Sequence, residues 1–180
     1  MRAWLSNFIC LLTGVFCLAF TQYQPLKDKT FSEFTGNTHI DEYYIKYTIY
    51  NGNVGFDNNW VAQNLTSNSY RILSYIRTNY PDIRMDDCRF MDDLEIFTVE
   101  MQTLNDKARF NKYTHNGEIW ALFDIRPDER RKSSIVLTNH PYFNGSLFKH
   151  ELAHYWYYRL CMDYSTDVDT EDFAIELENF

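Results

Sequence analysis

The sequence lacks an extended basic patch, internal repeats and low-complexity segments. Its formal net charge is -8, and its one short basic cluster, residues 126–132, also contains Asp128 and Glu129. A nucleic-acid-binding domain usually gathers lysine and arginine on one face, so the composition excludes that class and predicts no nucleic-acid partner. Hydrophobic residues make up 45% of the 180 positions, which is typical of one folded domain rather than a disordered chain.

The sequence also lacks an apolar run of the length that a transmembrane helix needs. After Arg2, residues 4–20 are largely apolar and uncharged, but the run is short and polar residues interrupt it. Small residues at Cys17 and Ala19 are typical of the site that signal peptidase cuts. The segment therefore predicts a signal peptide over residues 1–19, with an uncleaved anchor or a buried helix as the alternatives.

A cleaved signal predicts a secreted protein, either periplasmic or extracellular. An uncleaved segment predicts instead a membrane-anchored protein that faces outward, and only this form would touch a membrane. Residues 20–41 are mixed and polar and are predicted to be a lead-in. A single domain is predicted over residues 42–180.

Cysteine is scarce, with four in the chain, and removal of the signal leaves Cys88 and Cys161. In an exported protein an even pair of cysteines predicts a disulfide. Two separate buried thiols are the alternative.

The order of apolar patterns predicts an α+β domain with a mixed sheet of about five strands and a backing helix. Strands are predicted over residues 43–50, 84–91, 94–101, 118–125 and 133–139. Helices are predicted over residues 67–79, 146–161 and 170–179, and loops over residues 51–59 and 105–117.

Histidine is rare, yet two of the 5 histidines stand four positions apart in His150-Glu151-Leu152-Ala153-His154. On a helix, residues i and i+4 lie on one face, so both imidazoles can bind one zinc ion. Glu151 borders that face and can act as the general base for a zinc-activated water. The alternative is an ordinary amphipathic helix with two surface histidines.

A catalytic zinc site with two histidines needs a third protein ligand and an open position for water. Glu171 follows His154 by 17 positions, which is enough chain to reverse direction and place a second helix against the first. We therefore predict Glu171 as the third ligand. Asp167, Asp169 and Glu176 are the competing carboxylates.

These residues resemble the gluzincin branch of the zincin metallopeptidases, which pairs HExxH with a glutamate on a following helix. Thr170-Glu171-Asp172-Phe173-Ala174 is similar to that family's Asn-Glu-Gly-Phe-Ala segment, whose glutamate binds zinc. The resemblance implies a zincin-like fold, one Zn²⁺ ion, and an edge strand that holds an extended substrate by main-chain pairing. That strand would contain Ile119, Trp120, Ala121 and Leu122. The family also stabilises the oxyanion with a tyrosine or histidine, for which this chain offers Tyr157, Tyr158, Tyr164, His115 and His140.

The sequence thus predicts a zinc-dependent peptidase that hydrolyses peptide bonds in a peptide or protein substrate. One alternative is a zincin-like zinc-binding interaction protein without turnover, although a purely structural site would not need Glu151. The other alternative is a metal-dependent amidase that acts on cell-wall material.

Overall fold

A mixed five-stranded sheet and four helices make up the part of the chain that the computed structural model describes, namely residues 31–83, 91–100, 121–125, 132–139, 145–178 and 180. The strands are β1 (Ser32–Ile40), β2 (Tyr43–Asn51), β3 (Asp93–Val99), β4 (Ala121–Ile125) and β5 (Lys132–Thr138). The helices are α2 (Asn58–Asn79), α4 (Gly145–Arg159), α5 (Met162–Ser165) and α6 (Thr170–Glu178).

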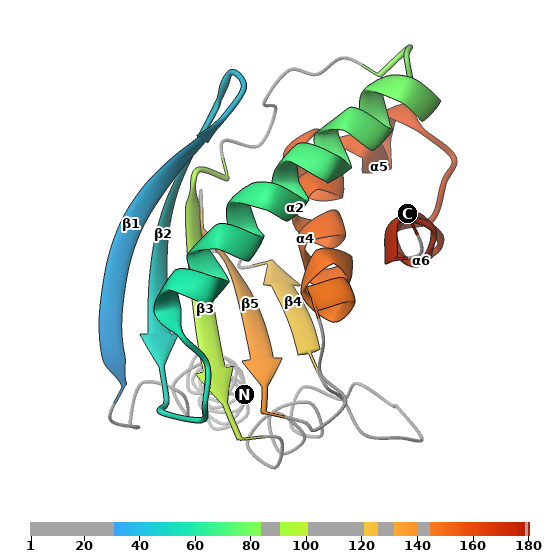
Figure 1. The fold of residues 1–180 in the computed structure, drawn as a ribbon. Coiled ribbons are helices and arrows are strands. Elements are labelled where there is room, and N and C mark those ends of the chain that lie inside the picture. The colour runs from blue at the N-terminus through green and yellow to red at the C-terminus, as the bar shows by residue number, and fades with distance from the viewer. Residues whose placement is uncertain (1–30, 84–90, 101–120, 126–131, 140–144, 179) are drawn as a thin grey trace, which may run out of the picture.

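The sheet order is β1-β2-β3-β5-β4, so β1 and β4 form its two edges. β2, β3 and β5 run parallel, whereas each edge strand is antiparallel to its neighbour. Both α2 and α4 lie on the same face of the sheet, and α6 packs beside α4 at the end that carries β4 (Figure 1).

The main core lies between that face and the two long helices. Alternation in β2 buries Ile45 and Ile49 toward the helices, where they join Ile72 of α2 and Trp156 of α4, all with an exposed fraction of 0%. On the opposite face, Phe97, Val99 and Val136 form a smaller buried cluster. The α4 helix and the β4 edge are therefore anchored to one continuous core.

The structure confirms the α+β class and the mixed sheet, and it bears out most of the predicted elements within the described residues. Five elements lie where a strand or helix was predicted, and their ends differ from the predicted ends by no more than two residues: β2, β3, β5, α4 and α6. The predicted strand over 118–125 is described only over β4. The predicted strand over 84–91, except Met91, and the loop over 105–117 lie outside the described residues, as do the signal peptide and Cys88.

Two boundaries differ from the predictions. Residues 32–40, assigned to the polar lead-in, form β1. Its inward positions include Gly36 and Thr38, so the apolar alternation that marks a half-buried strand is absent. The helix predicted from residue 67 begins at Asn58, because Asp57 caps it by accepting from the Asn59 N–H at 2.9 Å.

The described helices include none that is long and apolar enough to cross a membrane. Cys161 is disulfide-bonded, and its left-handed conformation, with φ at 51°, redirects the chain after α4. Every other cysteine lies outside the described residues, so the pairing with Cys88 stays a prediction.

Candidate metal centre

α4 presents the HExxH residues on the side that faces β4 and α6. His150 and His154 stand one turn apart, and their side chains are 16% and 8% exposed. Glu151 is buried on the adjoining edge of the same helix. The helix holds these polar groups firmly because Phe148, Leu152 and Trp156 bury its opposite side in the core.

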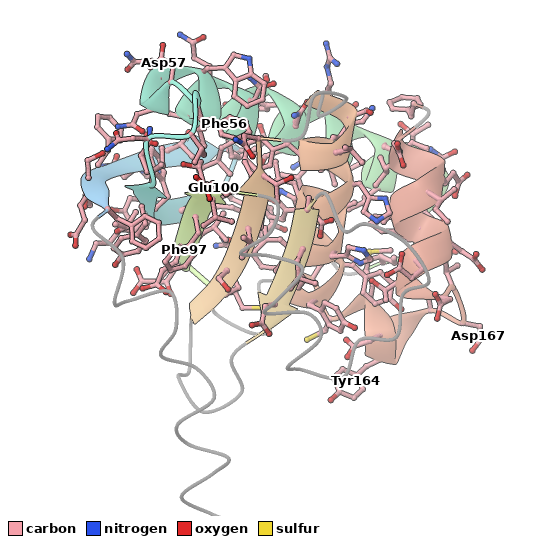
Figure 2. All side chains as sticks on the ribbon, turned by 90° about the horizontal axis from the view of Figure 1, so that it is seen from below. Phe56, Asp57, Phe97, Glu100, Tyr164 and Asp167 are labelled. Carbon is pink, nitrogen blue, oxygen red and sulfur yellow. The ribbon has the colours of Figure 1, made fainter. Side chains whose placement is uncertain are left out.

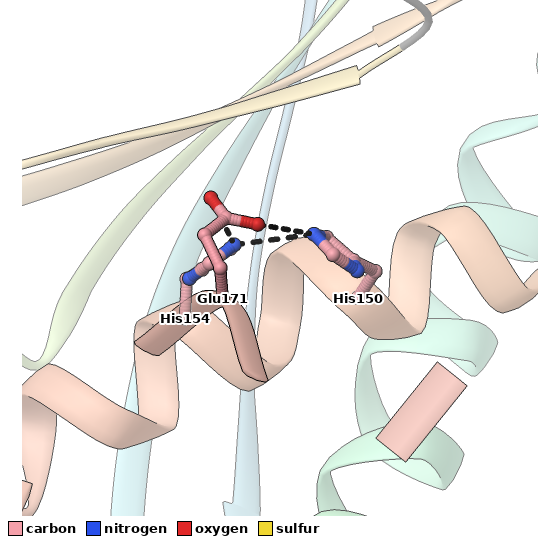
Figure 3. Close-up of side chains that lie close together, drawn as sticks. All are labelled: His150, His154 and Glu171. Atoms are coloured by element: carbon pink, nitrogen blue, oxygen red, sulfur yellow. Dashed lines mark hydrogen bonds and ion pairs between the residues drawn. The ribbon is translucent and has the colours of Figure 1, made fainter. Parts of the chain in front are cut away.

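The two imidazoles and the carboxylate of Glu171 converge on one point between α4 and α6 (Figure 3). The Nε2 atoms of His150 and His154 are 3.2 Å apart. One oxygen of Glu171 lies 3.6 Å from His150 Nε2, and the other lies 3.5 Å from His154 Nε2. His150, His154 and Glu171 therefore form a group that could hold a metal ion.

The donor set and its spacing fit a tetrahedral ion. Two imidazole nitrogens and one carboxylate are a common three-ligand set for catalytic zinc. Donors at about 2.0–2.1 Å from a tetrahedral ion lie about 3.3–3.4 Å from one another. The two Nε2 atoms are 3.2 Å apart, close to that value, and they lie 3.6 and 3.5 Å from two different oxygens of the Glu171 carboxylate. One donor atom from each of the three residues lies within 4.8 Å of the other two. Glu171 is 64% exposed, so the site is reached from the α6 side.

α6 is positioned by local contacts that the acidic C-terminal segment provides. Asp169 accepts from the Glu171 N–H at 2.8 Å and so caps the first turn of α6. The Tyr157 hydroxyl donates to the Val168 carbonyl at 2.6 Å, which ties the preceding loop to α4. Phe173 is buried and packs against Tyr157 with ring centroids 5.6 Å apart. These contacts bring Glu171 over the two histidines.

Each histidine also has a polar neighbour on α6 at its second ring nitrogen. His154 Nδ1 is 2.8 Å from the Thr170 hydroxyl, a hydrogen bond that fixes the ring orientation. His150 Nδ1 is 3.5 Å from a carboxylate oxygen of Glu178, which is an ion-pair distance. That nitrogen makes no hydrogen bond in the described structure, so the Glu178 carboxylate lies beside it without being hydrogen-bonded to it.

Glu151 lies against β4, where its carboxylate accepts from the backbone N–H of Phe123. Burial, and to a smaller extent the negative charges of Glu171 and Glu178, raise the pKa of Glu151, and the Phe123 hydrogen bond lowers it, with a net result of about 8. Burial and the neighbouring His150 lower the pKa of His154 to about 4. Both shifts describe the site without a metal charge, and a bound cation would favour the carboxylate form of Glu151.

The ring of Phe123 covers the same helix face. It stacks on His154 with centroids 6.2 Å apart and an interplanar angle of 12°. It also stacks on Tyr158 at 6.1 Å and 16°. One edge-strand residue therefore contacts the proposed base through its backbone and a proposed ligand through its ring.

The structure brings together the four residues predicted for metal binding and catalysis, His150, Glu151, His154 and Glu171. The competing carboxylates lie elsewhere: Asp169 caps α6, Asp167 is exposed, and Glu176 accepts from the Tyr80 hydroxyl at 3.4 Å. The metal-binding group within the described residues contains none of them.

The tyrosines predicted for the oxyanion occupy three different settings. Tyr157 uses its hydroxyl on the Val168 carbonyl, whereas Tyr158 lies one turn beyond His154 under Phe123. Tyr164 is 80% exposed and projects from the surface near Asp167 (Figure 2). Of these, only Tyr158 adjoins the metal face. His115 and His140 lie outside the described residues.

The predicted substrate strand is described only in part. Ala121 and Leu122 lie in β4, which is an edge of the sheet, as predicted, whereas Ile119 and Trp120 lie outside the described residues. Ala121 packs against the main core, and Leu122 packs against the smaller cluster on the opposite face.

Three site residues were not predicted from the sequence, namely Phe123, Thr170 and Glu178. Two of them left a signal in the sequence. Thr170 directly precedes the predicted ligand, and Glu178 stands seven positions after it, two turns along the same helix face. The role of Phe123 depends on the strand register and could not be read from spacing.

Comparisons of the chain with protein-family models, with curated proteins and with solved structures find no match.

Proposed function

We propose that this chain is a zinc-dependent peptidase in which His150, His154 and Glu171 hold the ion and Glu151 is the general base. The observation that carries the proposal is the convergence of three donor side chains, with one ligand atom from each within 4.8 Å of the others, beside a buried glutamate that does not belong to the donor set. A structural zinc site is closed by four protein ligands, whereas among the described residues this group has three and an exposed side.

The chemistry divides between the ion and the chain. A zinc ion would polarise the scissile carbonyl and make water more acidic, so that Glu151 can work near neutral pH. Glu151 would take the proton of the attacking water and pass it to the leaving amine nitrogen. The N–H of Phe123 fixes the carboxylate for both transfers, because Glu151 is already hydrogen-bonded to this strand.

β4 supports the choice of a peptide as the substrate. Since Glu151 reaches the Phe123 N–H, that group points away from β5 and toward the open edge. The backbone groups of Ala121 share this orientation, because successive residues of a strand alternate. An extended peptide pairing there would run past Glu151 and the metal group.

The test combines metal analysis with a peptidase assay. The purified chain should bind about one zinc ion and should degrade an unfolded protein substrate. A chelator should abolish the activity, and added zinc should restore it. The variant Glu151→Gln should keep its zinc and lose hydrolysis by roughly a hundredfold or more.

The matched control is Glu176→Gln, which removes a carboxylate from α6 outside the metal group and should leave turnover unchanged. Wild-type turnover in Glu151→Gln would rule out the mechanism. Zinc binding without hydrolysis of protein by the unmodified chain would indicate the non-catalytic alternative, and hydrolysis of peptidoglycan alone would indicate the amidase.

A further inference from the structure

The edge strand opposite the metal centre, β1, is long and regular. Its nine residues pair with β2 in unbroken register, from Ser32 opposite Asn51 to Ile40 opposite Tyr43. Among the described strands β1 has no neighbour on its outer side (Figure 1). Natural edge strands are usually short, bulged, or protected by proline or lysine, and β1 has none of these features.

The register determines which backbone groups of β1 face outward. Residues 41–42 form a two-residue turn, and the pair that flanks such a turn, Ile40 and Tyr43, is hydrogen-bonded. Every second residue back from Ile40 therefore directs its N–H and C=O toward β2. The residues between them direct theirs to the open edge: Glu33, Thr35, Asn37 and His39.

Two hydrogen bonds support this assignment of inward-facing and outward-facing backbone groups. On β2, the Lys46 N–H donates to the Asp92 carbonyl at 2.7 Å, so the even-numbered residues of β2 face away from β1. On β1, the Tyr70 hydroxyl of α2 donates to the His39 carbonyl at 3.3 Å. In the described residues this is the one hydrogen bond made to the outward backbone groups, and it leaves the other lone pair of that carbonyl available.

We propose that β1 pairs antiparallel with β1 of a second copy of this chain, about a two-fold axis at Gly36. Full overlap of two Ser32–Ile40 strands places Gly36 opposite its own copy and Thr35 opposite the partner's Asn37. Every outward-facing residue then pairs with another outward-facing residue, so the hydrogen-bonded ladder is complete. The result is one continuous sheet with the helices of both copies on the same face.

Side-chain complementarity favours this register. It places Glu33 opposite the partner's His39, and the two-fold axis creates this contact twice. Both side chains are exposed on the face without helices, so they can meet there without crossing the core. An imidazole N–H can donate to a carboxylate directly across an antiparallel pair, and the register that maximises overlap is the one that makes this match. Because a nine-residue edge buries little surface, the dimer is a weak one.

The first experiment compares Thr35→Pro with Thr35→Ser in the full chain, by sedimentation equilibrium over a range of concentrations. Proline removes an N–H that faces the open edge, so the monomer tolerates it, as edge strands commonly do. It also removes two ladder hydrogen bonds from the dimer and adds a ring in their place. The dissociation constant should rise by at least about tenfold in the proline variant and stay near wild type in the serine variant.

The second experiment reverses the charges and does not depend on proline. Glu33→Lys replaces the carboxylate that accepts from the partner's imidazole with a group that cannot accept, and should raise the dissociation constant by about three- to thirtyfold. Adding His39→Glu to that variant places opposite charges across the interface and should restore or strengthen association. A merely misfolded strand would not be rescued in this way.

Amide hydrogen exchange gives a residue-level reading of the same interface. The amides of Thr35 and Asn37 should exchange more slowly as concentration rises, while those of Gly36 and Thr38, already bonded to β2, should not change. A chain that stays monomeric up to about 1 mM would overturn the proposal. So would a dimer that Thr35→Pro and the charge reversal leave intact, since another surface or another partner segment would then hold it.

Discussion

The two long helices on the same face of the sheet are built on opposite principles. α2 is an amphipathic helix of 22 residues whose buried stripe contains apolar residues such as Leu65 and Ile72 and whose other side is polar and exposed. α4 has 15 residues, of which ten are buried, and these include Lys149, Glu151 and His154.

Burying ionisable groups opposes folding unless they are paired or held for another reason. The consequences are visible in their pKa values, since burial lowers that of Lys149 and raises that of Glu151 to about 8. The buried residues of α2 include no Asp, Glu, Lys, Arg or His. The difference agrees with the proposed role of α4 in chemistry and of α2 in supporting it.

The strongest way to break this contrast is to remove a proposed ligand. His154→Ala should lower zinc affinity by well over a hundredfold, because the loss of a direct ligand exceeds the 10–100-fold typical of outer partners. Competition titration with a chromophoric chelator measures the change. His39→Ala, which removes an exposed histidine of β1, is the matched control and should bind zinc normally. Retention of full zinc affinity by His154→Ala would refute the assignment.

A subtler change tests the partner that orients this ligand. Thr170→Val keeps the shape of the side chain and removes the hydroxyl that lies 2.8 Å from His154 Nδ1. Zinc affinity should fall by about 10–100-fold with the fold intact. Nitrogen chemical shifts of His154 should also report a changed tautomer balance in the metal-free chain, which a purely structural role for Thr170 would not produce. Unchanged shifts and affinity would contradict the role.

These two residues also illustrate what the sequence could and could not predict. His154 was predicted because the i, i+4 spacing of two histidines is a local property of any helix. Glu171 was predicted because the chain after His154 is long enough to reverse direction and place a second helix against the first, and the resemblance to a known segment implied the same residue. Thr170 and Phe123 were missed, because their roles depend on the angle at which α6 and β4 meet α4, and no local pattern encodes such an angle.

The fold follows the same rule. β2 was predicted because its buried positions alternate strictly, from Tyr43 to Ile49. β1 was missed because its pairing with β2, rather than an apolar pattern of its own, makes it a strand. Its inward residues include Gly36, and the ring of Tyr47 on β2 lies so close to Gly36 that a β-carbon there would collide with it. A strand that is stabilised by its neighbour rather than by its own apolar pattern cannot be predicted from the hydrophobic periodicity of the sequence.

The scaffold side of the contrast can be sharpened with Ile72→Val in α2. This change deletes one methyl group from a fully buried side chain and should destabilise the fold by about 0.5–1.5 kcal/mol. Urea unfolding measures the loss, and zinc affinity of the folded chain should not change. Ser74→Ala, on the exposed side of the same helix, should alter stability by less than about 0.5 kcal/mol. A loss of zinc affinity in Ile72→Val would show that α2 does more than support α4.

The smallest effect is expected where α2 meets the β1–β2 turn. Arg77 forms an ion pair with Asp41 and a second one with Glu42 at 3.3 Å, and the three side chains are 41%, 33% and 57% exposed. Ion pairs in such exposed positions contribute little, because water screens the charges and ordering the long side chains opposes the gain.

Arg77→Met retains much of the aliphatic stem and removes the charge, so stability should fall by at most about 1 kcal/mol at low salt. The difference from wild type should shrink further in about 1 M salt, where the screening length is about 3 Å. Urea unfolding at both salt concentrations measures it. A loss of stability above about 2 kcal/mol that persists in high salt would show that packing of the Arg77 side chain, rather than these charges, holds the end of α2. The amphipathic pattern of α2 does not predict such a packing role for an exposed arginine.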